Sequence, residues 1–167
     1  MGRLLRGQAG DDRSPIFRQE RLGARSVPFS IYKFRTLDSE TAKPLGRITG
    51  LIRRYGIDEL PQAYNIFRNE MSVVAHRSIP GHEQEEVFDN SPGGLVDRWK
   101  RIVEPTKSGL FSSFTLYNHS ETDKAGTMIE RAPMKLEWDI KDVIDGSLIY
   151  DMAIIASAFR AAAQGET

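Results

Sequence analysis

The strongest constraint on the fold is a pair of apolar segments with helical spacing that meet at Gly56. Before it, apolar side chains recur at positions i, i+3, i+4 and i+7, namely Ile48, Leu51, Ile52 and Tyr55. This spacing places them on one face of a helix that Gly56 would end. The second segment predicts a helix from Asp58 to about Asn69 that buries Leu60, Ala63, Tyr64 and Phe67. Pro61 would lie in its first turn, where a missing N–H costs nothing.

Two short β-prone runs precede these helices. They cover Pro15–Gln19 and Pro28–Thr36, and the connection Arg21–Ser26 between them contains a glycine. Two such runs around a loop predict a β-hairpin. In the second run Phe29 and Ile31 alternate with polar neighbours, as expected of a half-buried strand.

The rest of the chain predicts mostly helix. Ser91-Pro92-Gly93-Gly94 separates an acidic helical piece from Leu95–Ile102, and Asp145-Gly146 is the expected turn between two final helices. Leu110–Tyr117 is short and apolar, which indicates a strand or a buried loop. We therefore expect a mixed α/β (α+β) fold that is mostly helical, with one small N-terminal hairpin. Residues 1–14 would be a flexible lead and 15–167 a single domain.

Charge is unevenly distributed although the net charge of the 167 residues is zero. Residues 1–77 carry 14 Lys and Arg against 8 Asp and Glu, whereas residues 78–167 carry 9 against 15. A basic half suits phosphate on a nucleotide, a lipid surface or a nucleic acid, although two oppositely charged halves packing together would give the same pattern.

The absence of cysteine excludes disulfides and thiolate zinc sites. No stretch reaches the roughly 20 apolar residues of a membrane span, so we expect the chain as given to be soluble.

Two adjacent carboxylates, Asp58 and Glu59, stand where the second helix is expected to begin. Such a pair is often structural, because Asp is a favoured N-cap and Glu in the first turn suits the helix dipole. The same N–H groups also attract phosphate. An ionised carboxylate beside a diphosphate can attack phosphorus, and two neighbouring oxygen ligands suit Mg²⁺. The pair alone leaves both interpretations open.

Short motifs follow one another in a specific order through residues 15–77. They are Pro15–Gly23, Lys33-Phe34-Arg35-Thr36, Arg47-Ile48-Thr49, Asp58-Glu59-Leu60-Pro61-Gln62, Asn65-Ile66 and Met71-Ser72-Val73-Val74. Together they resemble the bacterial sugar transferase family, the monotopic polyprenyl-phosphate phosphoglycosyl transferases of glycan and exopolysaccharide assembly. No single motif is decisive, but their order and spacing together are specific.

The resemblance implies a two-step, ping-pong reaction. The aspartate matching Asp58 attacks the β-phosphorus of a UDP-sugar and releases UMP, and a polyprenyl phosphate then takes the sugar phosphate from the enzyme. Glu59 is implied to organise the site, with Mg²⁺ held by Asp58 and Glu59 and spanning the diphosphate. Lys33, Arg35 and Arg77 match basic positions of the family, and we expect them to counter phosphate charge. Solvated strand or loop charges are the structural alternative for them.

The same resemblance implies where the chain works. Its partners would be a UDP-sugar, a polyprenyl phosphate and the cytoplasmic face of the bacterial inner membrane, which amphipathic helices would contact. No nucleic acid is expected. The apolar segment that opens the family and dips into the bilayer is not found ahead of the matching region, which we interpret as a trimmed chain or a soluble relative.

Three further departures from the family pattern lie after the motifs. The family's Gly-Pro-Arg-Pro is Ala75-His76-Arg77-Ser78, and its Pro-Gly-Ile-Thr-Gly is Pro105-Thr106-Lys107-Ser108-Gly109. The Gln and Arg that usually follow are replaced by the more apolar run Phe111–Asn118. The nucleophile side of the expected site is thus intact, while the side expected to shape sugar and phosphate recognition is altered.

Two other functions stay open at this point. A catalytically silent relative that binds a nucleotide sugar or a partner enzyme would explain the altered residues 75–78 and 105–118. A nucleic-acid binder would use the basic, aromatic hairpin, because stacking platforms beside cations bind single strands. The basic excess is modest for such a footprint. The histidines His76, His82 and His119 form no known metal pattern and are expected at surface or packing positions.

Overall fold

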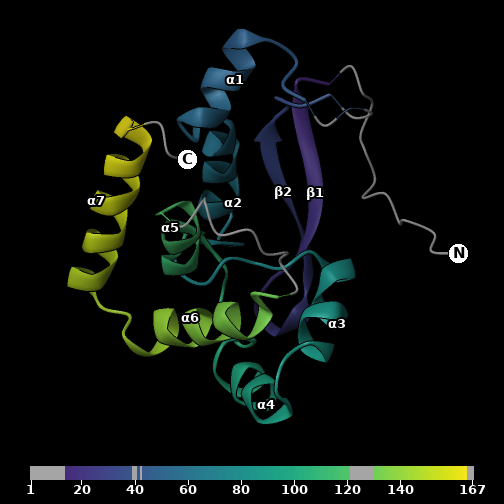
Figure 1. Cartoon of the computed structure of the whole chain (residues 1–167), viewed down its shortest axis with the longest axis vertical. Coiled ribbons are helices and arrows are strands. Elements are labelled where there is room, and N and C mark those ends of the chain that lie inside the picture. Colours follow the sequence, from purple (N-terminus) through teal and green to yellow (C-terminus); the bar gives the residue numbers. More distant parts are fainter. Residues whose placement is uncertain (1–13, 39–40, 42, 121–129, 165–167) are drawn as a thin grey trace, which may run out of the picture.

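The N-terminal part of the structure is a β-hairpin. The computed structural model describes residues 14–38, 41, 43–120 and 130–164. Strands β1 (Ile16–Leu22) and β2 (Pro28–Phe34) pair antiparallel along one side of the molecule (Figure 1). The predicted hairpin is confirmed, although β1 continues past the end of its predicted run. Of the predicted lead, residues 1–13 lie outside the described residues.

The hairpin turn holds the short 3-10 helix η1 (Ala24–Ser26). Gly23 N donates to Val27 O at 2.9 Å and closes the turn. Arg25 N donates to the carbonyl of Glu104 and Ser26 Oγ to its carboxylate, so the turn is attached to the helical part of the molecule.

Three helical segments follow the hairpin. They are α1 (Arg47–Arg54), the 3-10 helix η2 (Ile57–Gln62) and α2 (Ala63–Phe67). Gly56 separates the first two with a left-handed φ of 65°, a conformation that glycine adopts without strain. The first predicted helix and its stop are therefore confirmed. The second predicted helix is instead a 3-10 turn followed by a short α-helix.

The predicted burial of that second helix is wrong. Four side chains expected in the core are exposed: Leu60, Ala63, Tyr64 and Phe67. The buried side chains of the segment are polar: Asp58, Gln62 and Asn65. Asn65 Nδ2 donates to the Ser30 carbonyl of β2 at 2.7 Å. The helical spacing identifies the apolar face, but the polar face packs against the hairpin, where Asn65 Nδ2 has its hydrogen-bond acceptor and Asp58 is near the charge of Lys33.

The hydrophobic core lies in the second half of the chain. It joins α3 (Gly81–Asp89), α4 (Gly93–Ile102) and α6 (Ala132–Ile144), which gather at the lower end of the molecule in Figure 1. Its buried members are Ile79, Val87, Val96, Trp99, Val103, Ala132, Leu136 and Ile140. The predicted break at Ser91–Gly94 is confirmed, with α4 beginning at Gly93.

Two short strands pair in parallel: β3 (Ser72–Val74), which follows α2 in the chain, and β4 (Gly109–Phe111), which follows α4. Gly109 is required there, because an added Cβ would lie 2.2 Å from Ala75 N. Helix α5 (Ser113–Ser120) follows β4. The apolar segment expected to be a strand or a buried loop thus begins as a strand and continues as a helix.

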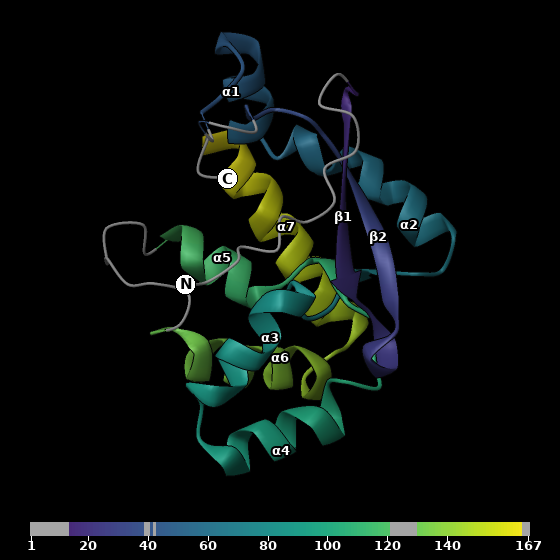
Figure 2. The same cartoon turned by 90° about the vertical axis from the view of Figure 1, so that its right-hand side faces the viewer.

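Helix α7 (Leu148–Gln164) lies on the side of the molecule opposite the hairpin (Figure 1), and Figure 2 shows it running from the level of α6 towards α1. The predicted turn at Asp145-Gly146 is confirmed. Tyr150 of α7 donates its hydroxyl to Asp142 Oδ1 of α6 at 2.8 Å and lies 2.7 Å from Ser113 Oγ of α5. The fold is α+β and mostly helical, as expected. Within the described ranges, no helix has the length and apolar character needed to cross a membrane.

Candidate active site

Asp58 lies in the first turn of η2 and is only 7 % exposed. The N-cap of this 3-10 helix is Gly56, and no side chain makes a capping hydrogen bond. The capping interpretation of Asp58 is therefore not supported. Instead η2 packs against β2, which brings the carboxylate pair to the hairpin.

Glu59 is bound by two cations from distant parts of the chain. Its Oε1 accepts from Lys33 Nζ of β2 at 2.7 Å and from Arg77 Nη2 at 2.5 Å. Arg77 Nη1 lies 3.3 Å from the other oxygen, so the arginine spans both oxygens. The structure thus brings together three residues that the sequence predicted as members of one site.

The two neighbouring carboxylates have opposite pKa shifts. Burial alone would raise the pKa of Glu59, but the charges and hydrogen bonds of Arg77 and Lys33 outweigh it and lower this pKa to about 2. For Asp58, burial and then the negative charge of Glu59 raise the pKa above its usual value. The charges of Lys33 and Arg53 act on Asp58 in the other direction without cancelling this shift. Glu59 therefore stays ionised, and Asp58 is the more basic member of the pair.

The cations respond to the same surroundings. Burial lowers the pKa of Lys33, and Glu59 only partly compensates for it. The Arg77 side chain is 31 % exposed, and although partial burial acts to lower its pKa, the carboxylate of Glu59 raises that pKa above the usual value. Arg21 of β1 lies near both groups, and burial together with the charge of Arg77 lowers its pKa to about 10.

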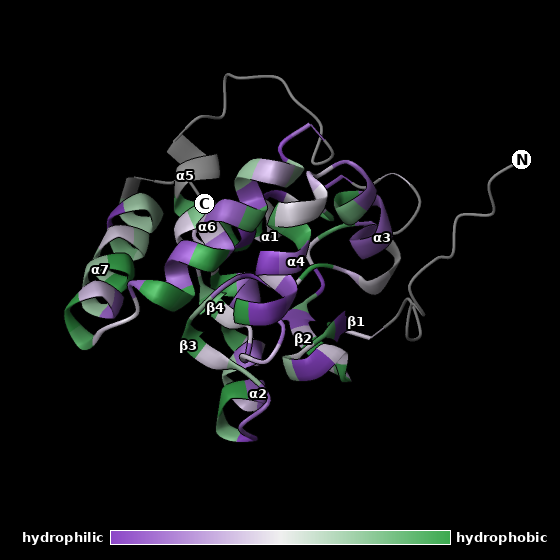
Figure 3. Ribbon diagram, turned by 90° about the horizontal axis from the view of Figure 1, so that it is seen from below, coloured by the Kyte–Doolittle hydropathy of each residue, from purple (hydrophilic) through white to green (hydrophobic). Residues whose placement is uncertain are grey.

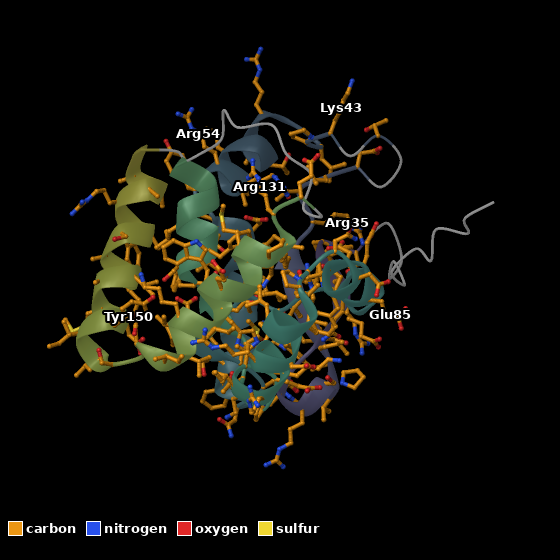
Figure 4. The ribbon with its side chains drawn as sticks, turned by 60° about the horizontal axis from the view of Figure 1, so that its bottom comes forward. Arg35, Lys43, Arg54, Glu85, Arg131 and Tyr150 are labelled. Atoms are coloured by element: carbon orange, nitrogen blue, oxygen red, sulfur yellow. The ribbon has the colours of Figure 1, made fainter. Side chains whose placement is uncertain are left out.

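Arg35 follows the end of β2. Its Nε donates to Ser14 O at 2.8 Å, and its guanidinium lies 5.8 Å from the ring centroid of Phe17. These contacts place it at the start of the hairpin, and its role in binding phosphate stays a prediction. Figure 4 shows Arg35 close to the hairpin.

Two cations that were not predicted from the sequence contact the segment around Arg77. Arg21 donates to the carbonyl of Ser78 at 3.0 Å, and Lys135 of α6 donates to the carbonyl of Arg77 at 3.0 Å. Arg21 belongs to the motif Pro15–Gly23, and Lys135 belongs to a later stretch, Lys135-Leu136-Glu137, that also resembles the family pattern. Their positions in these stretches were the only signal, because Arg and Lys are ordinarily exposed.

His76 is a packing residue, as expected. Its ring lies edge-on to Trp99 with centroids 6.2 Å apart, and its Nδ1 lies 3.3 Å from Thr106 Oγ1. Burial, followed by the charge of Lys135, lowers its pKa to about 3, so it is neutral near pH 7. The side chains of His82 and His119 lie outside what the structure describes.

The carboxylate pair fits a Mg²⁺ ion that is shared with a substrate. In the described portion of the chain, Oε2 of Glu59 has only the 3.3 Å contact with Arg77, and a carboxylate oxygen accepts more than one bond. Among the described residues, no group of three or more His, Asp or Glu could hold a metal by itself. Mg²⁺ is commonly bound by one or two carboxylates together with substrate phosphates, which suits this donor set.

Comparison with known proteins identifies the family of the chain. The family model described as "Bacterial sugar transferase" matches residues 6–165, and the chain belongs to this family. A "putative undecaprenyl-phosphate N-acetylgalactosaminyl 1-phosphate transferase" of Bacillus subtilis is 36 % identical over 89 residues, 47 % of this chain and 50 % of that protein.

Two other relatives align over more of the chain. A "UDP-N-acetylgalactosamine-undecaprenyl-phosphate N-acetylgalactosaminephosphotransferase" of Aeromonas hydrophila is 26 % identical over 87 % of this chain and 34 % of its own length. A "UDP-glucose:undecaprenyl-phosphate glucose-1-phosphate transferase" of Escherichia coli K12 is 24 % identical over 84 % and 31 %. The chain thus spans half or less of the length of these curated relatives.

Proposed function

We propose that this chain transfers a sugar 1-phosphate from a UDP-sugar to a polyprenyl phosphate through a covalent intermediate on Asp58, and so initiates assembly of a glycan or exopolysaccharide. The observation that carries the proposal is the difference in hydrogen bonding and pKa between the two adjacent carboxylates. Glu59 takes the hydrogen bonds of Lys33 and Arg77, whereas burial and repulsion raise the pKa of Asp58. Environments that separate two neighbouring pKa values in this way assign different chemical roles to the two groups.

Asp58 is the nucleophile in this proposal. An ionised Asp58 oxygen forms a bond to the β-phosphorus of the UDP-sugar, and the bond from that phosphorus to the bridging oxygen breaks. UMP leaves with the bridging oxygen and its electron pair. A phosphate oxygen of the polyprenyl phosphate then attacks the same phosphorus and returns Asp58 to a carboxylate. The first step needs no proton.

Lys33 and Arg77 support this chemistry in two ways. They keep Glu59 ionised and fixed beside Asp58, and their positive charge favours binding of the diphosphate. We include Arg35 as a further phosphate-binding residue at the edge of the site. The names of the relatives, each of which specifies undecaprenyl phosphate and a sugar phosphate transfer, support the substrate classes.

Asp58 and Glu59 would hold Mg²⁺ together with the diphosphate. When bound, the ion neutralises charge between partners that otherwise repel each other. A UDP-sugar should therefore bind at least tenfold more tightly to the protein with Mg²⁺ than with EDTA, a difference of about 1.4 kcal/mol or more. Isothermal titration calorimetry in the two conditions measures this, and equal affinities would exclude the metal role.

We propose that the chain acts at the cytoplasmic face of the bacterial inner membrane. The exposed apolar side chains of α1, η2 and α2 support a surface that lies on lipid: Ile48, Leu51, Leu60, Tyr64 and Phe67. The arginines Arg47, Arg53 and Arg54 on α1 suit the anionic headgroups of that leaflet.

The intermediate gives the decisive test. Offered a UDP-sugar and Mg²⁺ without acceptor, the protein should release at most one UMP per chain. The sugar phosphate should then appear as added mass on the peptide that contains Asp58. Several UDP-sugars should be used, because the altered residues 105–118 leave the donor open.

Asp58→Asn is the matched variant, because it removes the nucleophile without changing side-chain size. It should abolish UMP release and the adduct while the protein melts at the same temperature or higher, since the folded protein disfavours the charge of Asp58. An adduct on another residue would refute the role of Asp58. If no donor gives UMP or an adduct, the catalytically silent relative becomes the better description.

A further inference from the structure

Arg77 lies in a stretch of backbone without regular secondary structure. Residues 76–80 form neither helix nor strand and connect β3 to α3. The Arg77 guanidinium nevertheless meets Glu59 with both terminal nitrogens, at 2.5 and 3.3 Å. A two-point contact of this kind requires a fixed backbone. Gly109 N of β4 binds the carbonyl of His76 at 2.8 Å. The carbonyls of Arg77 and Ser78, which follow it, are bound by side chains instead.

A buried lysine and a half-buried arginine bind consecutive carbonyls of this stretch. Lys135 Nζ of α6 donates to Arg77 O at 3.0 Å. Arg21 Nη1 of β1 donates to Ser78 O at 3.0 Å, while its Nη2 is held by Gln19 at 2.8 Å. The two donors lie 58 and 57 residues away from the carbonyls that they bind, so the contacts exist only in the folded chain.

Stability alone does not account for these cations. Lys135 is 2 % exposed and pairs at 2.6 Å with Asp139, which is fully buried and also accepts from Trp99 Nε1. Replacing a buried ion pair with apolar residues is often neutral or stabilising. Within the described part of the chain, Asp139 Oδ1 and Arg21 Nε are buried without a hydrogen-bond partner, which adds to the cost. A cation at these positions donates a hydrogen bond to a backbone carbonyl, which an apolar side chain cannot do.

We propose that Arg21 and Lys135 are positioning residues, which hold the guanidinium of Arg77 on Glu59 by binding the backbone carbonyls of Ser78 and Arg77. Asp139 fixes the ammonium of Lys135 in turn. The inference rests on the proposed function for its catalytic meaning, because Glu59 and Arg77 belong to that site. The structural claim can be tested without any turnover.

The test measures the pKa of Glu59 by NMR titration of its side-chain ¹³C carboxylate resonance. Lys135→Met/Asp139→Asn removes the donor and both charges but keeps an acceptor for Trp99. Arg21→Met removes the second donor together with a charge that acts on Glu59, so it is compared with Arg21→Gln, which loses the same charge but keeps a donor for Ser78 O. In each folded methionine variant Arg77 should loosen, and the pKa of Glu59 should rise from about 2 by about one unit or more, since an opposite charge in contact typically lowers such a pKa by 1–3 units.

Matched controls lie on the same elements. Lys141→Met removes an exposed lysine of α6, and Arg18→Met an exposed arginine of β1. Neither should change the pKa of Glu59. Lys135→Gln/Asp139→Asn keeps a neutral donor that can reach Arg77 O, so it should restore most of the low pKa. This rescue separates carbonyl binding from charge and from packing.

An unchanged pKa of Glu59 in folded Lys135→Met/Asp139→Asn and Arg21→Met would overturn the proposal. So would a glutamine variant that behaves like the methionine one. If one methionine variant does not fold, the other methionine variant, compared with its glutamine counterpart, decides the question in the same way. If the wild-type protein releases no UMP from any donor, the proposed function is refuted, but the pKa comparison still tests whether Arg21 and Lys135 position Arg77. Failure of the one proposal is therefore distinguishable from failure of the other.

Discussion

His76 is a titratable side chain placed where its charge cannot be solvated. It is 5 % exposed, lies against Trp99 and is near the ammonium of Lys135. The folded protein therefore binds a proton at His76 only near pH 3, whereas the unfolded chain binds it near the ordinary value of 6.5. Below pH 6.5 the unfolded state binds more protons, so the free energy of unfolding falls as pH falls.

This linkage predicts a difference between wild type and His76→Gln. Lowering the pH from 7 to 5 should cost the wild type about 2 kcal/mol more of unfolding free energy than the variant, because glutamine does not titrate. Urea unfolding of both proteins at the two pH values measures the difference. All other titrating groups are common to both proteins and cancel. Parallel pH dependence in the two proteins would show that His76 is protonated in the folded state.

At the scale of residues, the sequence predicted the members of the candidate site but not the residues that bind the backbone around Arg77. Lys33, Glu59 and Arg77 were expected together because their motifs match one family, and the structure joins them by hydrogen bonds. Arg21 and Lys135 were missed, because the burial of a cation depends on carbonyls that lie far away in the sequence. Local propensity contains no information about such contacts.

The elements η2 and α2 show what periodicity can and cannot predict. It located the apolar face of the segment correctly, yet Phe67 on that face is 91 % exposed. The pattern does not state whether a face meets protein, water or lipid. Here the polar face turns inward, since Asp58 and Asn65 contact or approach polar groups of β2. In this segment the apolar face is therefore exposed and does not belong to the core.

The strand pair β3–β4 gives a prediction at the scale of elements. Gly109→Ala should push β4 away from β3, because the new Cβ would lie 2.2 Å from Ala75 N and 2.7 Å from Ala75 O. Backbone atoms cannot yield as a flexible side chain does, so we expect a loss of about 1–3 kcal/mol in unfolding free energy. Chemical denaturation measures it. UMP release should fall as well, since β3 leads directly to Arg77.

Gly94→Ala is the control for this substitution. Its added Cβ would have no neighbour within 4 Å, and the residue lies in the first turn of α4. Alanine there should leave the protein unchanged or stabilise it by up to about 1 kcal/mol. Equal stability of the two variants would show that β3 and β4 are not tightly paired at Gly109.

The whole molecule separates its core from its apolar surface. The core lies with α3, α4 and α6, whereas α1 and the exposed apolar residues that follow it lie beside the hairpin (Figures 1 and 2). Figure 3 shows apolar stretches on α2 and on α7. Lys43 and Arg54 project from the end of the molecule that carries α1 (Figure 4). Apolar and basic groups thus share one end, an arrangement that suits an anionic bilayer surface.

This arrangement predicts weak, salt-sensitive binding to vesicles. Vesicles that contain phosphatidylglycerol should bind the protein better than neutral phosphatidylcholine vesicles at low salt, because each basic residue near an anionic surface contributes about 1 kcal/mol. Phe67→Ser and Leu60→Ser should weaken binding about tenfold each, since burying such a side chain contributes about 1.5–3 kcal/mol. Cosedimentation measures the bound fraction.

Val27→Ser is the matched control: Val27 is 60 % exposed, as Leu60 is, but lies in the hairpin turn away from α1. Binding that ignores lipid charge, or that Val27→Ser weakens as much as Leu60→Ser, would contradict a membrane surface at α1, η2 and α2.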